Sequence, residues 1–279
     1  MTDTPVLDIR DLTVGVPGRD LVCGVDLTLA AGERVGLVGE SGSGKSLLSL
    51  AVMRLNPPPT RITSGSIRVA GRDHVTASEQ ELCAARGASV AMVYQDPLTS
   101  LNPVRTVGRQ ITEAVRAHAA VSRTAARRRA VDLLGEVGIP DPAVRVDAYP
   151  HEFSGGMRQR VVIAMALAAE PRVLIADEPT TALDVTTQAR ILALLDRIAD
   201  EHGTAVLFIT HDLAVAAGFC RRVEVMRRGR IVESAPTERV FARPRHPYTR
   251  GLLDALCTLD VDPARPLAVL DDTEGTRHE

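Results

Sequence analysis

Short apolar segments rich in valine and isoleucine alternate along the chain with longer segments of helical periodicity. Segments of this length, bounded by glycine and proline, are typical of strands. Three of them, at 34–38, 172–176 and 205–210, are almost entirely apolar, as expected of parallel strands covered on both faces. The pattern therefore predicts an α/β fold with a parallel sheet at its centre. The predicted strands span residues 6–10, 25–29, 34–38, 66–70, 89–93, 172–176, 205–210, 223–227 and 230–233.

The pattern changes between about residues 97 and 170, where no clear strand occurs and helical periodicity prevails. Apolar positions recur there at helical spacing over 106–118, 123–136 and 157–169. We interpret this region as a helical subdomain inserted into the α/β core. The first 30 residues and the 60s predict short antiparallel strands at the edge of that core.

One domain is expected over residues 1–256, because 279 residues with 45% hydrophobic content can bury a full core. The segment 257–279 is acidic and lacks a periodic apolar face, so we expect a flexible tail. The longest apolar run, at 161–169, is roughly 13 Å long as a helix, against about 30 Å for the hydrocarbon core of a membrane. We therefore expect no membrane-spanning segment, and the N-terminus lacks the pattern of a signal peptide.

Charge and cysteine content argue against several classes of protein. The 33 basic and 35 acidic residues nearly cancel and tryptophan is absent, so no nucleic-acid partner is predicted. The four cysteines have no metal-ligand spacing, and we interpret them as reduced thiols of a cytosolic protein.

Residues 39–46 read GESGSGKS and match the pattern GxxxxGK(S/T), between the predicted strand at 34–38 and a helical pattern at 46–54. Glycines in such a loop let backbone amides point at phosphate oxygens, and the following helix adds partial positive charge. Lys45, the only lysine in the chain, is predicted to reach the β- and γ-phosphates, and Ser46 to bind Mg²⁺. A glycine-rich turn without a ligand is the alternative. The predicted nucleotide-binding residues are Gly39, Glu40, Ser41, Gly42, Ser43, Gly44, Lys45, Ser46 and Leu47.

A second candidate site follows the apolar strand at 172–176, where the sequence continues with Asp177 and Glu178. Ligands bind at the carboxyl ends of strands in α/β sheets, so we expect Asp177 to hold Mg²⁺ and Glu178 to face an attacking water. An acidic turn that caps the next helix is the alternative. A GTPase is not indicated, because its Asn-Lys-x-Asp segment needs a second lysine.

A third candidate is formed by Ser154, Gly155 and Gly156 at the start of the helical segment 157–169. Exposed amides, a hydroxyl and the positive end of a helix together make an anion-binding site. A simple helix N-cap is the alternative. The presence of two such helix starts in one chain favours the anion site.

Together these motifs resemble those of the nucleotide-binding subunits of ABC transporters, over about residues 5–257. GESGSGKS is similar to the Walker A motif, VLIADE to Walker B and FSGGMRQR to the signature. The resemblance extends to Gln95 as the Q-loop residue, Asp184 in the D-loop and His211 as the switch histidine. It implies a P-loop NTPase (RecA-like) core with an N-terminal antiparallel β subdomain and an inserted α-helical subdomain.

The resemblance also implies a head-to-tail dimer, with ATP and Mg²⁺ between the Walker A motif of one chain and the signature of its partner. Glu178 is then the catalytic base, Gln95 and His211 are further catalytic residues, and Asp184 communicates across the interface. The implied Mg²⁺ ligands are Ser46, Gln95 and Asp177. The implied signature residues, which act in trans, are Ser154, Gly155, Gly156 and Gln159.

A narrower resemblance, to the ATPases of oligopeptide, dipeptide and nickel importers, rests on YQDPLTSLNP at 94–103 and RHPYTRGLL at 245–253. Turn-forming Asp-Pro and Asn-Pro pairs are the alternative explanation of the first segment. The importer resemblance implies uptake of peptides, or of nickel, and a position on the cytoplasmic face of the cell membrane.

The implied partners are a second ATPase subunit, identical or related, two transmembrane permease subunits and, indirectly, an extracytoplasmic substrate-binding protein. Two other functions stay open at this point. One is a non-transport ABC-type ATPase of DNA repair, chromosome organisation or translation. The other is a nucleotide-binding regulatory module.

The sequence departs from the family pattern in three features. Val16 stands where many relatives stack an aromatic side chain on adenine. Phe153 and Met157 replace the Leu and Gln of the general signature, a change from which we expect little effect. No cysteine cluster follows Cys257, so no iron–sulfur site is predicted.

Arg123 and the three arginines at 127–129 form one basic cluster in the helical region. We interpret it as the solvent-exposed face of a helix. The alternative is a docking patch for a permease or for lipid head groups.

Overall fold

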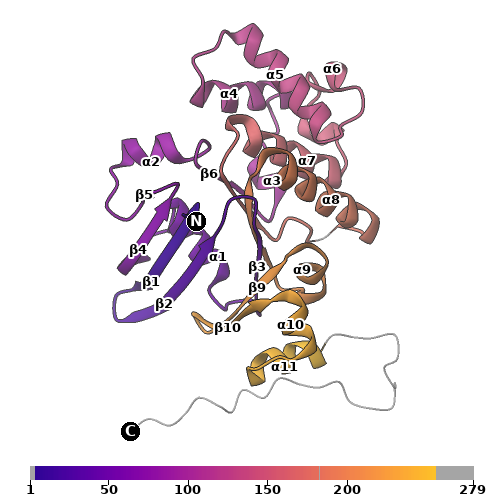
Figure 1. Cartoon of the computed structure of the whole chain (residues 1–279). Helices are drawn as coiled ribbons and strands as arrows, with labels where there is room; N and C mark the ends of the chain where they lie inside the picture. The colour runs from indigo at the N-terminus through magenta and orange to yellow at the C-terminus, as the bar shows by residue number, and fades with distance from the viewer. Residues whose placement is uncertain (1–3, 182, 256–279) are drawn as a thin grey trace.

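The computed structural model describes residues 4–181 and 183–255, which form two β-sheets with helices around them (Figure 1). The predicted tail at 257–279, Cys257 included, lies outside the described residues, so the domain limits stay a prediction. No helix in the described part of the chain is long and apolar enough to cross a bilayer.

The larger sheet has the strand order β10-β9-β3-β8-β7-β6. Its strands run parallel except for β10, which pairs with β9 in the antiparallel direction. The predicted parallel sheet is therefore confirmed. The strands are β3 (Arg34–Val38), β6 (Val90–Val93), β7 (Val173–Asp177), β8 (Ala205–Thr210), β9 (Arg222–Arg227) and β10 (Arg230–Pro236).

Side chains of the parallel strands enter two different cores, because successive residues of a strand point to opposite faces. In β8, Val206 and Phe208 face the core under the helices, whereas Ala205 and Leu207 face the core between the two sheets. Each residue of β8 is buried, which explains why all of them except Thr210 are apolar.

The smaller sheet is antiparallel and has the order β2-β1-β4-β5. The expectation of short strands is wrong here, since β1 and β2 have 10 and 11 residues. The pairing of β1 with β2 shifts register between Ile9 and Leu12, where Asp11 has a φ of 44°. This irregularity interrupts the alternation of apolar and polar residues along β1, so the sequence pattern predicted only the strand 6–10 there. The strands are β1 (Leu7–Val16), β2 (Arg19–Leu29), β4 (Arg61–Val69) and β5 (Arg72–Asp73).

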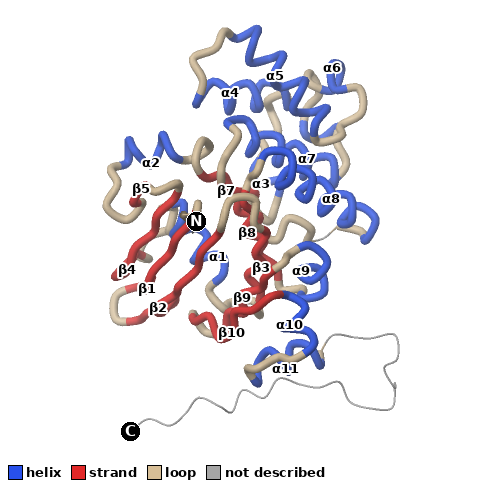
Figure 2. The backbone as a smooth tube through the Cα atoms, in the orientation of Figure 1, coloured by secondary structure: helices blue, strands red, loops and turns tan. Residues whose placement is uncertain are grey.

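Helix α1 (Lys45–Met53) lies between the two sheets (Figure 2). Its residues Leu48 and Val52 are fully buried in the core that both sheets share. The start of this helix is thereby held at the carboxyl end of β3, directly after the glycine-rich loop.

Each described element between Pro97 and Ala169 is helical, as expected of the inserted subdomain (Figure 1). The basic cluster lies on α5, where Arg123, Arg127 and Arg128 are exposed and Arg129 is half-buried. Arg127 donates to both carboxylate oxygens of Asp147, at 2.9 and 2.6 Å, as on a solvated helix face. The helices are α3 (Pro97–Ser100), α4 (Val107–His118), α5 (Arg123–Glu136), α6 (Pro142–Arg145), η1 (Pro150–Glu152), α7 (Gly155–Ala166) and η2 (Leu167–Ala169).

The remaining helices lie outside the segments for which the sequence pattern predicts a helix. Helix α8 covers the larger sheet, and its buried Leu195 and Ile198 join the core under the helices. Helices α10 and α11 end the described chain, beside β10 (Figure 1). These helices are α2 (Glu79–Ala85), α8 (Val185–His202), α9 (Leu213–Phe219), α10 (Thr237–Ala242) and α11 (Pro247–Asp254).

Candidate functional site

The predicted catalytic and phosphate-binding residues follow the carboxyl ends of four parallel strands. The loop 39–46 follows β3, Gln95 follows β6, Asp177 ends β7 and His211 follows β8. The strands are neighbours in the order β3, β8, β7 and β6, so their carboxyl ends meet at one edge of the sheet. Segments from distant parts of the sequence are thereby brought into one site.

Lys45 is folded back into its own loop. Its ammonium group donates to the carbonyl oxygens of Gly39 and Glu40 at 2.7 and 2.8 Å, and the residue is only 5% exposed. Burial lowers the pKa of Lys45, and the carboxylates of Glu178, Asp177 and Glu40 oppose this effect. An ammonium held by neutral carbonyl groups can exchange them for the more strongly binding oxygens of a phosphate.

The close contact between the loop and strand β9 requires glycine at position 39. A Cβ atom on Gly39 would lie 2.1 Å from the carbonyl oxygen of Met226, and φ there is 156°. The N–H of Gly229 donates to the carbonyl oxygen of Ser43 at 2.9 Å. The β9-β10 hairpin therefore holds the loop from one side.

Ser46 and Asp177 meet at the start of α1. The Ser46 hydroxyl donates to Oδ1 of Asp177 at 3.4 Å. Burial raises the pKa of Asp177, and this hydrogen bond offsets part of the rise. A hydroxyl and a carboxylate are oxygen ligands of the kind that Mg²⁺ prefers, so the pair fits the predicted cation.

Three side chains converge on the carboxylate of Glu178. Gln95 Nε2 and Thr181 Oγ1 each donate to Oε2 at 2.9 Å, and Nδ1 of His211 lies 3.1 Å from Oε1. Burial pushes the pKa of Glu178 up, but the hydrogen bonds from His211 and Thr181, together with the positive charges of His211 and Lys45, hold it below its usual value. The backbone of Glu178 is left-handed, with φ of 47°, a strained conformation of the kind that occurs at functional sites.

These side chains line one cavity of about 1050 Å³. The predicted residues among its lining are Glu40, Ser41, Gly42, Gly44, Lys45, Ser46, Leu47, Gln95, Glu178 and His211. Val16 does not line it, because β1 ends there and the following turn brings Arg19 to the cavity instead. Sequence reasoning did not assign the remaining lining residues to the site, although Thr181 follows the Asp177-Glu178 motif closely and Leu252 lies within the segment 245–253. They are Arg19, Asp20, Leu21, Thr181, Arg228, Gly229 and Leu252.

The predicted signature residues lie elsewhere, at the N-terminus of α7, and do not line this cavity. Ser154 is exposed and caps α7 by accepting from the N–H of Met157 at 3.3 Å. A Cβ atom on Gly156 would lie 2.4 Å from Cγ2 of Thr187, so glycine is needed where α7 approaches α8. Asp184 caps α8 by accepting from the N–H and the hydroxyl of Thr187, at 2.9 and 2.8 Å. The signature and the D-loop therefore form one surface, and anion binding there stays a prediction.

Gln159 does not belong to this surface, contrary to the expectation from the sequence. Its side chain is 1% exposed, and Nε2 is buried without a hydrogen-bond partner among the described residues. The position lies five residues after Ser154, which turns it about 140° away on a helix. Gln159 is therefore not placed to contact a nucleotide on another chain.

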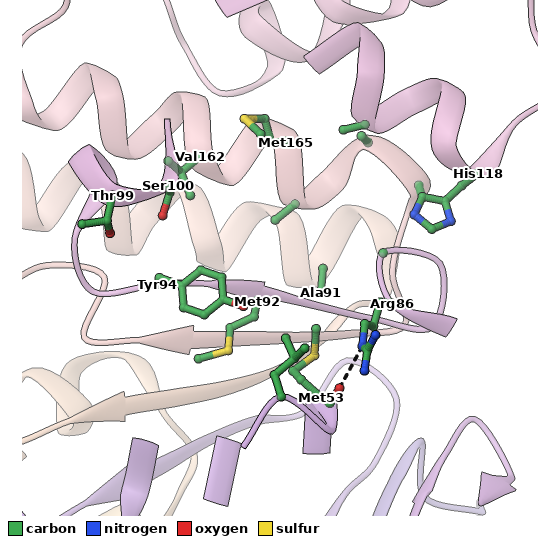
Figure 3. Close-up of a pocket in the computed structure, with 16 residues that line it drawn as sticks. Met53, Arg86, Ala91, Met92, Tyr94, Thr99, Ser100, His118, Val162 and Met165 are labelled. Carbon is green, nitrogen blue, oxygen red and sulfur yellow. Dashed lines mark hydrogen bonds between the residues drawn. The ribbon is translucent and has the colours of Figure 1, made fainter. Parts of the chain in front are cut away.

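A second cavity, of about 610 Å³, lies between the larger sheet and the helical region (Figure 3). Tyr94 projects into it, with Met92 on one side of the ring and Val162 and Met165 of α7 on the other. Tyr94 immediately precedes Gln95, so neighbouring residues of one segment line the two cavities.

The strand order, the loop after β3 and the groups around Glu178 define a P-loop nucleotide-binding protein. Residues 22–181 match the family described as ABC transporter, and the chain belongs to this family of ATPases. Its fold is similar to that in "Dimeric structure of a post-hydrolysis state of the ATP-binding cassette MJ0796 bound to ADP and Pi". The TM-score is 0.72 with 28% identity, covering 83% of this chain and 98% of that chain, so the expected fold class is confirmed.

Within this family the chain belongs to the oligopeptide/dipeptide branch, as the sequence predicts. Residues 232–275 match the family described as "Oligopeptide/dipeptide transporter, C-terminal region". The chain is 50% identical to the oligopeptide transport ATP-binding protein OppD of Bacillus subtilis, over 97% of this chain and 77% of OppD. It is 51% identical to the dipeptide transport ATP-binding protein DppD of Escherichia coli, over 83% of this chain and 71% of DppD.

Proposed function

We propose that this chain binds and hydrolyses MgATP at its larger cavity to drive the import of peptides through separate permease subunits. The observation that carries the proposal is the convergence of three hydrogen-bonding side chains on Glu178, in the same cavity as Lys45. An oriented carboxylate beside a phosphate-binding loop is what hydrolysis of a phosphoanhydride requires.

Hydrolysis is an in-line attack of water on the γ-phosphate. Glu178 accepts a hydrogen bond from this water and orients it, and its lowered pKa keeps the carboxylate ionised. Lys45 leaves the carbonyl groups of its loop for the phosphate oxygens and stabilises the charge that develops there. Ser46, Asp177 and the amide oxygen of Gln95 would hold Mg²⁺, which would neutralise part of the phosphate charge.

His211 and Thr181 have a shared role at the same carboxylate. Both lie within hydrogen-bond distance of Glu178 and keep its oxygens in one orientation. His211 is more than half exposed and lines the cavity, so it is also placed to contact the γ-phosphate. These contacts support its role as a catalytic residue.

A second ATPase chain completes the site with its signature. The hydroxyl of Ser154 and the amides of Gly155 and Gly156 contact the γ-phosphate bound to the partner, and Asp184 lies at the interface between the chains. Two observations support this arrangement. The signature surface is exposed and lies outside the cavity of its own chain, and the similar cassette MJ0796 is described as dimeric with ADP and Pi.

Peptides are the proposed cargo because the relatives OppD and DppD are named for the transport of oligopeptides and dipeptides. The match of residues 232–275 to the oligopeptide/dipeptide C-terminal family favours peptides over nickel. The chain acts at the cytoplasmic face of the membrane, with two permease subunits and, indirectly, an extracytoplasmic binding protein.

The permease docks at the second cavity, around Tyr94. This cavity is lined mainly by apolar side chains, and Tyr94 is 38% exposed, as suits an apolar segment of a membrane subunit. Movement of Tyr94 is transmitted to Gln95 through one peptide bond, and Gln95 holds Glu178. The surface therefore connects a partner with the catalytic carboxylate.

Substitution of Glu178 by Gln tests the catalytic proposal, because it removes the charge and keeps the shape. We expect turnover to fall at least about a hundredfold, since a general base contributes that much. MgATP binding should persist, and the variant should accumulate a closed dimer. Steady-state phosphate release and size-exclusion chromatography with MgATP measure the two effects.

The control is Glu170→Gln, at a carboxylate that is 69% exposed and does not line the larger cavity. It should hydrolyse ATP like the unmodified protein. Undiminished hydrolysis by Glu178→Gln would remove Glu178 from its proposed role.

A further inference from the structure

The segment RHPYTRGLL, which the importer resemblance singles out, forms α11 and the residues before it. Leu252 of this helix lines the nucleotide cavity, together with the loop after β3. The helix belongs to the last described part of the chain, whereas the loop lies near the N-terminus. The C-terminal helix therefore contributes directly to the wall of the nucleotide site.

Tyr248 connects α11 to the phosphate-binding loop itself. Its hydroxyl accepts a hydrogen bond of 3.0 Å from the backbone N–H of Glu40, which is 208 positions earlier in the chain. Tyr248 is 3% exposed, and the guanidinium of Arg227 lies 4.8 Å from the centroid of its ring. The side chain of Tyr248 is thus fixed by contacts to both its ring and its hydroxyl group.

Contacts that do not involve the loop fix the position of this tyrosine. The two carboxylate oxygens of Glu233, in β10, accept from the N–H groups of Arg245 and His246 at 2.9 and 3.0 Å. The ring of His246 caps α11 by accepting from the N–H of Tyr248 at 3.1 Å. The larger sheet therefore anchors the start of α11 before any nucleotide binds.

Glu40 is held at both ends of its backbone. Tyr248 binds its N–H, and the ammonium group of Lys45 binds its carbonyl oxygen. A phosphate that draws Lys45 away removes the second bond and leaves the first. The hydroxyl of Tyr248 then holds the second residue of the loop in place while the other amides of the loop face the phosphates.

We propose that Tyr248 is a positioning residue of the nucleotide site, which presets the phosphate-binding loop for MgATP. The inference rests on the proposed ATPase function and deepens it by assigning a role to the C-terminal RHPYT segment. Tyr248 does not touch the reacting atoms. Its removal should therefore weaken nucleotide binding and leave the chemical step unchanged.

Tyr248→Phe tests this, because it deletes one hydroxyl and keeps the ring for Arg227. The dissociation constant for the Mg²⁺ complex of β,γ-imido-ATP, measured by titration calorimetry, should rise about two- to tenfold, the effect of one hydrogen bond. KM for ATP should rise in parallel, and kcat at saturating ATP should stay within about twofold of the unmodified value.

Tyr149→Phe is the matched control, because this tyrosine is 41% exposed, stacks on His151 and lines neither cavity. It should bind the analogue like the unmodified protein. A purely structural role of Tyr248 would lower the melting temperature and leave nucleotide affinity unchanged. That result, or equal affinities of the two phenylalanine variants, would overturn the inference.

Lys45→Ala separates this outcome from a failure of the underlying function. If the analogue binds to Lys45→Ala as tightly as to the unmodified protein, both the proposed nucleotide site and the proposed role of Tyr248 are contradicted. If Lys45→Ala loses binding and Tyr248→Phe does not, only the role of Tyr248 is overturned.

Discussion

The nucleotide cavity and the signature surface are built in different ways. The cavity collects side chains from the ends of four neighbouring strands, whereas the signature surface is the exposed start of α7 beside the start of α8. The cavity and the start of α1 supply a buried ammonium and the carboxylates of Glu178 and Asp177, and the signature surface supplies amides and a hydroxyl. Each region thus provides what the other does not, as expected of a site completed by a second copy or a related chain.

The largest effect is expected in the cavity, from Lys45→Arg. The variant keeps the charge but replaces a compact ammonium with a planar fork. Lys45 is 5% exposed, and its ammonium group lies between carbonyl oxygens at 2.7 and 2.8 Å, an arrangement that suits a compact point charge better than a planar guanidinium. We expect affinity for MgATP and turnover each to fall at least about a hundredfold, measured by calorimetry and phosphate release.

The control is the reverse exchange, Arg128→Lys, at an exposed position of α5. It should change neither the affinity for MgATP nor the turnover. Normal MgATP binding by Lys45→Arg would show that positive charge alone suffices in the cavity. The shape of the phosphate-binding loop would then not explain why the chain keeps its one lysine there.

A smaller effect, confined to turnover, is expected at the signature surface from Ser154→Arg. The bulky side chain blocks the start of α7, so turnover should fall at least about tenfold. MgATP affinity should stay within about twofold, because Ser154 lies outside the cavity of its own chain. Together, these two results would show that the signature surface contributes to turnover but not to MgATP binding in its own chain.

Ser122→Arg is a matched control, because Ser122 caps α5 with the same kind of bond, from the N–H of Ala125 at 3.2 Å. Both variants lose an N-cap worth about 1 kcal/mol of stability. Only Ser154→Arg should lose turnover. An equal loss of turnover in both variants would show that Ser154 acts only as the N-cap of α7.

The smallest effect on the isolated ATPase is expected at the second cavity, from Ala166→Arg. Ala166 is half-buried in the wall of this cavity, which is separate from both regions compared above. Basal turnover should stay within about twofold, because no group at the nucleotide is changed. Peptide uptake and stimulation of turnover by the permease should be lost.

Val144→Arg introduces the same side chain at a 73% exposed position on α6, outside the second cavity, and should leave uptake intact. Normal uptake by Ala166→Arg would mean that the permease docks elsewhere.

Most of the larger sheet and of the cavity could be predicted from the sequence. Strands such as β8 are recognisable because burial on both faces makes nearly every position apolar. The loop 39–46 is recognisable because phosphate binding fixes its glycines and its lysine at set spacings. These signals are local, so a single sequence is sufficient to detect them.

The features that were missed depend on contacts between distant residues. Tyr248 reaches Glu40 across 208 positions, and nothing in the spacing of either segment indicates that contact. Leu252 and Arg19 line the cavity for the same reason. Gln159 was assigned to the signature surface by its place in a motif, but helical geometry turns it into the core.

The central claim is that one active site combines the cavity of one chain with the signature surface of another. It is tested most directly by mixing two variants that each lack one half of the shared site, Lys45→Ala and Ser154→Arg. In a mixed dimer, the intact cavity of the Ser154→Arg chain faces the intact signature of the Lys45→Ala chain. Phosphate release by the mixture is the measurement.

Randomly mixed equal amounts give mixed dimers for half of the total, each with one intact site of two. The mixture should therefore recover up to about a quarter of the unmodified turnover, above the residual turnover of either variant alone. Turnover of the mixture that never exceeds that of the separate variants, at concentrations where the unmodified protein is active, would contradict a shared site.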